Sequence, residues 1–146
     1  MKKLLFALFC VFAFVQCRPT LYSVIQLPTQ FIEIGSYGGF AGATTSYYIL
    51  PNGQQFMTSG TIGSPLTSNE ITPVTAKVYK AMCSRLDAIR FNQLSGNELG
   101  NMTYFVRHKT RKSDHKIQWS FMDSVPLELV SFYQDALNNI KPQAIN

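Results

Sequence analysis

The stretch IEIGSYGGFAGATTSYYI, residues 32–49, sets the glycine-rich run GGFAG between two segments with the composition of β-strands. On its N-terminal side, residues 31–36 (FIEIGS) alternate as a half-buried strand does. On its C-terminal side, residues 44–50 (TTSYYIL) are rich in β-branched and aromatic side chains, which favour strands. The stretch therefore predicts two strands joined by a glycine-rich junction.

The glycines of this junction do not fit a phosphate-binding loop. A dinucleotide loop of the form G-x-G-x-x-G would need glycine at position 37 and a helix after the last glycine, but Tyr37 and a predicted strand stand there. Gly38, Gly39 and Gly42 are instead predicted to shape a bulged strand junction, where the backbone turns or approaches closely. Phe40 either anchors that junction in the core or is presented at a surface, and the core position is favoured.

The rest of the chain predicts two hairpins and two amphipathic helices. An Asn-Gly turn at Asn52-Gly53 closes a hairpin over residues 44–59, and a loop rich in Gly, Ser and Thr follows over residues 61–71. The later elements are a helix over residues 73–89 capped by Thr72, a loop over 91–100, strands over 102–109 and 115–121, and a second helix that begins at Ser124-Val125-Pro126.

This order predicts the α+β class. We expect a single domain over residues 30–146, with an antiparallel sheet of about five strands in ββ(β)αββα order and both helices packed on one face. A chain of 146 residues with 46% hydrophobic residues can bury a core of that size.

The N-terminus has the features of an export signal. Two lysines precede an apolar run from Leu4 to Val15, which is about the length of a secretory signal core and too short to span a bilayer. Because Phe14 stands three residues before Cys17, we expect residues 1–16 to be a lipoprotein-type signal peptide and Cys17 to be acylated. The alternatives are ordinary cleavage nearby or an uncleaved anchor.

These features predict a lipoprotein anchored to a membrane of the bacterial cell envelope, with a secreted or periplasmic protein as the alternative. Residues 17–29 would be the lipidated cysteine and a proline-containing tether. Cys83 would then be the one cysteine left in the domain, which excludes a disulfide framework. The net charge of +5 includes two lysines of the signal, so the mature chain is only mildly basic, and no nucleic-acid partner is expected.

Candidate chemistry is sparse. His108 and His115 face each other across the predicted second hairpin and could offer two ligands to zinc, but exposed hairpin histidines are the favoured interpretation. The basic run at residues 107–116 is interpreted as a solvated hairpin tip, or as a contact for acidic lipid head groups or an acidic partner. No known hydrolase motif occurs, so we expect a non-enzymatic protein with no cofactor and no metal site.

The junction resembles one family, that of emfourin, the protealysin inhibitor. In that family a first strand runs into Ser-Gly-Gly-Phe-Ala-Gly and then a second strand; here Gly38, Gly39, Phe40, Ala41 and Gly42 match the core of the motif. The resemblance implies a small α+β domain that inhibits thermolysin-like metalloproteases. The chain is also similar to a group of bacterial lipoproteins that share a GGF-x-G motif. The alternative to an inhibitor is a structural lipoprotein that packs within a larger envelope assembly.

Overall fold

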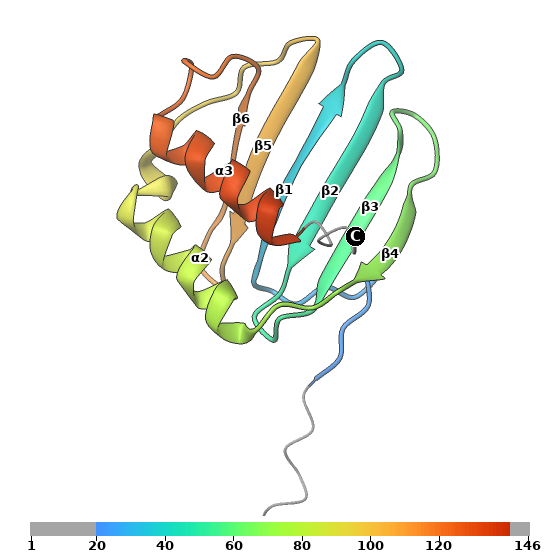
Figure 1. Cartoon of the computed structure of the whole chain (residues 1–146), viewed down its shortest axis with the longest axis vertical. Helices are drawn as coiled ribbons and strands as arrows, with labels where there is room; N and C mark the ends of the chain where they lie inside the picture. Colours follow the sequence, from blue (N-terminus) through green and yellow to red (C-terminus); the bar gives the residue numbers. More distant parts are fainter. Residues whose placement is uncertain (1–19, 141–146) are drawn as a thin grey trace, which may run out of the picture.

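The structure is a computed structural model that describes residues 20–140 (Figure 1). The described chain contains six strands, two α-helices and one short 3-10 helix. Their bounds are β1 (Phe31–Gly38), β2 (Ala43–Ile49), β3 (Gln55–Thr61), β4 (Thr67–Ile71), α2 (Ala76–Ala88), η1 (Phe91–Gln93), β5 (Met102–Lys109), β6 (Asp114–Trp119) and α3 (Leu127–Ile140).

The strands form one antiparallel sheet in the order β4-β3-β2-β1-β5-β6. The first four strands follow one another as a meander, and α2 with η1 then carries the chain across to β5 on the other side of β1. Both α2 and α3 cover the same face of the sheet (Figure 1). The α+β class is therefore confirmed, with six strands where about five were expected.

The additional strand is β4. Its sequence, TSNEI, lies in the segment predicted as a loop, because no apolar alternation marks a strand there. In the structure, four of its five residues are exposed. It forms by backbone pairing with β3, from Gln55↔Ile71 to Ser59↔Thr67. An edge strand of this kind is held by backbone hydrogen bonds to its neighbour, and the pattern of side chains in the sequence does not indicate such bonds.

The main core lies between the sheet and the helices. Its fully buried members include Ile32, Ile34 and Val106 from the sheet and Leu86 and Leu129 from the helices. The predicted apolar face of α3 is confirmed, and Phe132 joins it because α3 also packs beside α2. On α2 the buried residues are Tyr79, Met82 and Leu86, whereas Ala81 is exposed.

The helix α2 begins three residues later than predicted. Thr75, rather than Thr72, is the N-cap, and its hydroxyl accepts a hydrogen bond from the Val78 amide at 3.4 Å. The amide of Val74 instead donates to the Gly53 carbonyl at 3.0 Å, which ties the chain to the β2–β3 turn before the helix starts. A contact between segments distant in sequence therefore sets the start of the helix.

A second apolar cluster lies on the opposite face of the sheet. Phe31, Leu50 and Phe56 are buried there, packed against Tyr22, Val24 and Leu27 of the N-terminal segment. The Tyr22 amide also donates to Gln54 Oε1 at 2.9 Å. Within residues 17–29, which were expected to be a tether, Tyr22, Val24 and Leu27 pack on the sheet, so the folded part of the chain begins before Gln30.

Candidate binding surface at one end of the sheet

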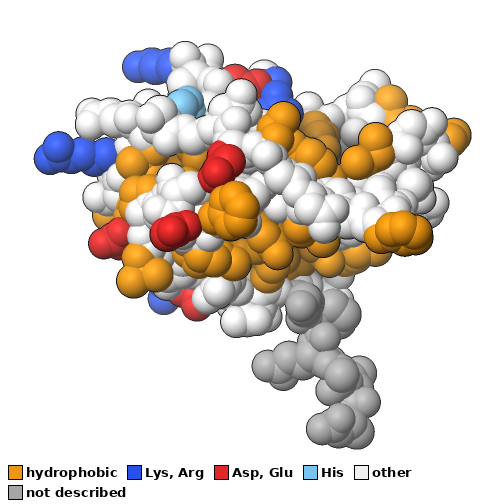
Figure 2. Space-filling view, turned by 90° about the horizontal axis from the view of Figure 1, so that it is seen from above, with side chains coloured by type: hydrophobic (Ala, Val, Ile, Leu, Met, Phe, Trp, Pro, Cys, Tyr) orange, Lys and Arg blue, Asp and Glu red, His pale blue; other side chains and the backbone are white. Residues whose placement is uncertain are grey.

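Exposed apolar side chains gather at one end of the sheet, the end at which β1 finishes and which is drawn at the top of Figure 1. Four connections meet here: the β1–β2 turn, the β3–β4 turn, the loop before β5 and the loop after β6. Figure 2 looks onto this end and shows apolar side chains exposed across it. We call the following set the apolar rim: Phe40, Ile62, Leu66, Leu99, Met102, Phe121 and Met122.

The β1–β2 turn presents Phe40 at the centre of this rim. The Gly42 amide donates to the Gly39 carbonyl at 3.0 Å, so Phe40 and Ala41 are the two central residues of a tight turn. Gly38, Gly39 and Gly42 carry positive φ angles of 116°, 73° and 58°, while Phe40 and Ala41 do not. The glycines thus take the left-handed backbone positions, which suit a residue without a Cβ atom. The side chain of Phe40 is left fully exposed, at 108%.

Two expectations for this motif are corrected. Phe40 does not anchor the core, because a tight turn with two central residues holds its side chain beyond the end of the sheet, away from both apolar clusters. The junction is also not bulged, since the register runs without interruption to Gly38↔Ala43. GGFAG is a hairpin turn, and its glycines serve to close that hairpin.

Hydrogen bonds tie this turn to the connections on both sides of it. The Gly39 amide donates to the Asn101 carbonyl in the loop before β5, and the Ile62 amide donates to the Gly42 carbonyl at 2.8 Å. A Cβ atom on Gly38 would lie only 2.1 Å from the Asn101 oxygen, so a glycine is required for this approach. The turn is therefore held in the middle of the rim by backbone contacts, with Phe40 projecting from it.

Sequence reasoning found only Phe40 among the seven residues of the rim. The others stand in segments interpreted as loops or as strand ends, where single exposed apolar residues are common and carry no signal. Their shared position is the signal that could have identified them, because each lies at or next to a strand terminus at the same end of an antiparallel sheet. That position required knowledge of the strand order.

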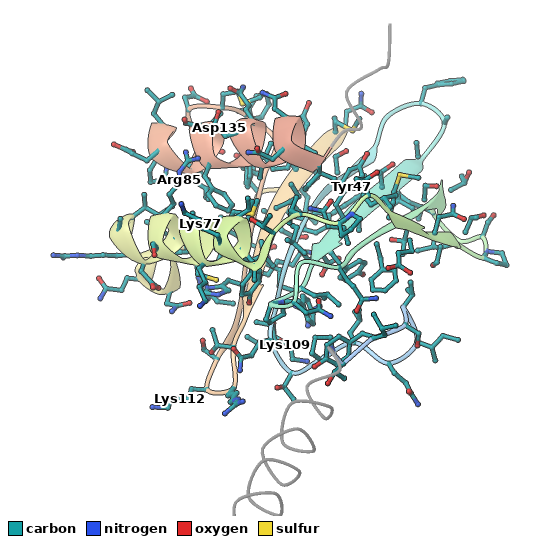
Figure 3. The ribbon with its side chains drawn as sticks, turned by 60° about the horizontal axis from the view of Figure 1, so that its bottom comes forward. Tyr47, Lys77, Arg85, Lys109, Lys112 and Asp135 are labelled. Atoms are coloured by element: carbon teal, nitrogen blue, oxygen red, sulfur yellow. The ribbon has the colours of Figure 1, made fainter. Side chains whose placement is uncertain are left out.

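A shallow groove of about 390 Å³ runs between the end of α2 and the start of α3. Leu127, Phe132 and Ile89 give it an apolar lining, with Glu128 and Ser131 at its side. Arg85 lies over the Phe132 ring at 5.5 Å and forms an ion pair with Asp135 at 2.9 Å, which joins the two helices (Figure 3). Both charged side chains are about half exposed, so this pair contributes little to stability.

Cys83 meets a histidine that sequence spacing did not bring near it. Its Sγ lies 3.8 Å from His108 Nε2, between α2 and the sheet. Burial raises the pKa of the Cys83 thiol and lowers the pKa of the His108 imidazole. Both shifts favour the neutral forms, the opposite of the thiolate that a nucleophilic cysteine needs. This geometry supports a structural role for Cys83, packed between α2 and the sheet, over a reactive one.

His108 and His115 do lie opposite each other in the β5–β6 register, as predicted. They are not exposed hairpin residues, however: His108 is only 5% exposed, and His115 is half-buried, with its Nε2 3.0 Å from the Leu94 carbonyl. Each ring has its own neighbours beneath the helices. Within residues 20–140 no three His, Cys, Asp or Glu side chains come together in a way that could hold a metal ion.

The predicted anchor lies outside the described residues. The signal peptide at residues 1–16 and the acylation site at Cys17 both precede Thr20, the first residue that the structure describes. Among the helices of residues 20–140, none has the length and apolar character needed to cross a membrane.

No family model matches this chain, and no curated protein matches its sequence.

Proposed function

We propose that the protein is a non-enzymatic lipoprotein of the bacterial envelope, and that its domain binds a protein partner through the apolar rim. The observation that carries this proposal is Phe40, a large aromatic side chain that is fully exposed on a turn fixed by hydrogen bonds on both sides. Aromatic anchors on rigid supports dominate the energy of protein interfaces, because little conformational freedom is lost when they bind. Other apolar rim residues surround it, as expected for the centre of a contact patch.

The direction of the rim supports a partner rather than a lipid. The chain enters the domain at the end of the sheet where β1 begins, drawn at the bottom of Figure 1, and the rim lies at the other end. An acyl chain on Cys17 would place the first end at the membrane. The rim would then face away from the bilayer, toward other envelope proteins.

The resemblance to emfourin supplies a specific candidate for the partner, a thermolysin-like metalloprotease. The residues that carry the resemblance, Gly38 to Gly42, are the same residues that build the exposed turn. An inhibitor needs a rigid projecting loop that resists rearrangement in the protease cleft, and this turn has that form.

Titration of the chain from Arg18 onward against a thermolysin-like protease tests this form of the proposal. We expect inhibition at micromolar concentration or below, and at least a tenfold weaker effect for Phe40→Ala, since truncating an interface anchor costs about 1.4 kcal/mol or more. Leu127→Ala, which removes an exposed side chain from the α2–α3 groove, is the matched control and should inhibit like the parent. No inhibition by the parent chain at micromolar concentration would exclude the inhibitor function.

The alternative is a structural lipoprotein that packs within a larger envelope assembly. The α2–α3 groove favours it, because a second apolar contact surface on another side of the domain suits a subunit with more than one neighbour. Affinity purification from solubilised envelopes would recover a stable complex that survives Phe40→Ala. A chain that stays monomeric without partners would contradict this alternative.

The tether is tested separately by Cys17→Ser. We expect the variant to leave the membrane fraction, because the acylated sulfur is removed while the domain is unchanged. If the variant still fractionates with membranes, acylation at Cys17 is not the anchor.

A further inference from the structure

The start of the described chain is attached to the end of the sheet opposite the rim. Asn52 Nδ2 donates to the Thr20 carbonyl at 2.8 Å, which holds Thr20 beside the β2–β3 turn. Cys17 precedes Thr20 by three residues. Even a fully extended chain would place Cys17 within about 11 Å of Thr20, so a lipid on Cys17 would bring this end of the sheet to the membrane surface.

The β5–β6 turn lies at the same end. Lys109 pairs with Phe31, the first residue of β1, and the neighbouring Ile32 pairs with Ile49 at the end of β2. Figure 3 shows Lys112 at the tip of this hairpin, away from the helices, while Lys109 Nζ lies 5.6 Å from the centroid of the Phe31 ring. We call Lys109, Arg111 and Lys112 the basic edge. In the order of the sheet, β5 is next to β1, and β1 is next to β2. The chain leaves β2 at this same end and forms the turn that contains Asn52, which holds Thr20.

The acids near the basic edge are already engaged. Arg107 makes two hydrogen bonds of 2.7 Å with Asp114, through Nε and Nη2, and a third of 3.3 Å with Glu33. The hydrogen bonds from Arg107 lower the pKa of the Asp114 carboxyl, which therefore stays ionised and paired. Lys109 is 3.8 Å from the same carboxylate. At the far side of this end, Glu70 accepts a hydrogen bond from Gln54 at 3.1 Å.

Arg111 and Lys112 are exposed and form no ion pair with any residue between positions 20 and 140. With Arg107 and Lys109, the hairpin supplies four cations at this end against the two carboxylates of Glu33 and Asp114, whereas Lys116 Nζ lies over the Phe105 ring, farther along the sheet. A net positive charge therefore remains at the end of the domain nearest to Cys17. Basic residues close to an anionic bilayer each strengthen association by about fivefold.

We propose that the basic edge binds anionic lipid head groups and thereby holds the domain upright, with the apolar rim directed away from the bilayer. This inference depends on the proposed acylation of Cys17, which brings the edge to the surface, and it adds the second contact that fixes orientation. A flexible single attachment would leave the rim free to turn toward the membrane. The occupant is assigned as lipid because the charge lies beside the anchor point.

The test uses the mature protein purified from membranes and reconstituted into vesicles. Lysine acetylation followed by mass spectrometry measures the exposure of Lys109 and Lys112. We expect acetylation of both to fall at least threefold in phosphatidylglycerol vesicles relative to phosphatidylcholine vesicles, and the protection to vanish at 0.5 M salt, where exposed charges are screened. Lys80, exposed on α2, should react equally in both.

Charge reversal provides the matched variants. Lys112→Glu should reduce the protection of Lys109 in anionic vesicles, and Arg111→Glu combined with Lys112→Glu should abolish it. Arg90→Glu makes the same charge change as Lys112→Glu at the exposed end of α2, and it should leave the protection intact. Circular dichroism of each variant checks that a lost signal does not arise from unfolding.

The outcomes separate this inference from the proposed tether. The mass of the N-terminal peptide reports acylation of Cys17 in the same sample. Equal acetylation in anionic and neutral vesicles overturns the inference, whether or not the acyl group is present. Protection that appears only in native envelopes, and not in protein-free phosphatidylglycerol vesicles, also overturns it and assigns the basic edge to an acidic protein. If the chain carries no acyl group and its lysines are still protected in anionic vesicles, the result supports lipid binding by the basic edge and contradicts acylation of Cys17.

Discussion

Gly38 is the residue at which the β1–β2 turn has least room. It combines a φ of 116° with an approach to the Asn101 oxygen that no side chain allows, and it lies between the sheet and the rim. Gly39 has φ of 73° but faces open space. Substitutions at Gly38 and Gly39 can therefore distinguish the free-energy cost of a positive φ angle from the additional cost of a steric clash with Asn101.

We expect Gly38→Ala to lower the free energy of unfolding by about 2–4 kcal/mol, because strain and overlap add. Gly39→Ala should lower it by about 1–2 kcal/mol, the cost of a left-handed position alone. Urea denaturation followed by Trp119 fluorescence measures both. Equal losses for the two variants would show that the contact with Asn101 is not formed.

His108 is the residue whose burial makes stability depend on pH. Burial lowers its pKa in the folded state, and the charge of Asp87 on α2 opposes this only in part. The unfolded chain, with a histidine pKa of about 6.5, therefore binds the proton more readily. The contribution of His108 is complete above that pH and is lost as the pH falls through about 6.5 toward the folded-state pKa.

Replacing His108 by Gln should accordingly flatten the decline in unfolding free energy between pH 7.5 and pH 5. Denaturation of the parent chain and of the variant at a series of pH values gives both slopes. A decline that is unchanged by His108→Gln would assign the pH dependence to other groups.

At the scale of elements, the N-terminal segment packs on the face of the sheet opposite the helices. Leu27 packs against the cluster of Phe31, Leu50 and Phe56, whereas Ile25 in the same segment is 96% exposed. Burial on this face also raises the pKa of Tyr48 to about 12, together with the nearby charge of Glu33. The segment thus shields the face of the sheet that the helices leave uncovered.

Leu27→Ala should reduce the unfolding free energy by about 1–2 kcal/mol, the contribution of a partly buried apolar side chain. Ile25→Ala should change it by less than about 0.5 kcal/mol, as exposed positions do. Thermal and urea unfolding of the two variants test the contrast. A neutral Leu27→Ala would restore the interpretation of this segment as a loose tether.

At the scale of the whole molecule, the domain has two ends with different chemistry. The apolar rim lies at one end, and the basic edge lies at the other, beside the start of the described chain (Figures 1 and 3). Consecutive antiparallel strands produce this arrangement, because their turns alternate between the two ends of the sheet. A contact made at one end leaves the other end accessible.

The rim should therefore be dispensable for folding. Phe40→Ser combined with Phe121→Ser removes two exposed aromatic rings, and we expect the melting temperature to change by no more than about 3 °C. Partner capture from solubilised envelopes should be lost in the same variant. A large drop in melting temperature would mean that these rings pack in the folded state.

The alternation of residues 31–36, the Asn-Gly turn and the apolar stripe of α3 were enough to predict an α+β domain with an antiparallel sheet, since each is encoded by neighbours in sequence. The glycine-rich connection between the first two strands was predicted for the same reason, although as a bulged junction and not as the tight turn that Gly38, Gly39 and Gly42 form. The position of Phe40 was not, because side-chain burial depends on what lies beyond the turn, and there the sheet ends.

The sequence by itself thus determined the class of fold, the presence of a glycine-rich connection between the first two strands, and an N-terminus with the pattern of a lipoprotein signal. Only the tertiary structure decided that Cys83 meets His108, that β4 completes the sheet, and that seven apolar side chains from four connections share one end. These features arise from contacts between segments far apart in the chain. Their free energy comes from packing and backbone pairing across the sheet, which a local pattern of residues does not contain.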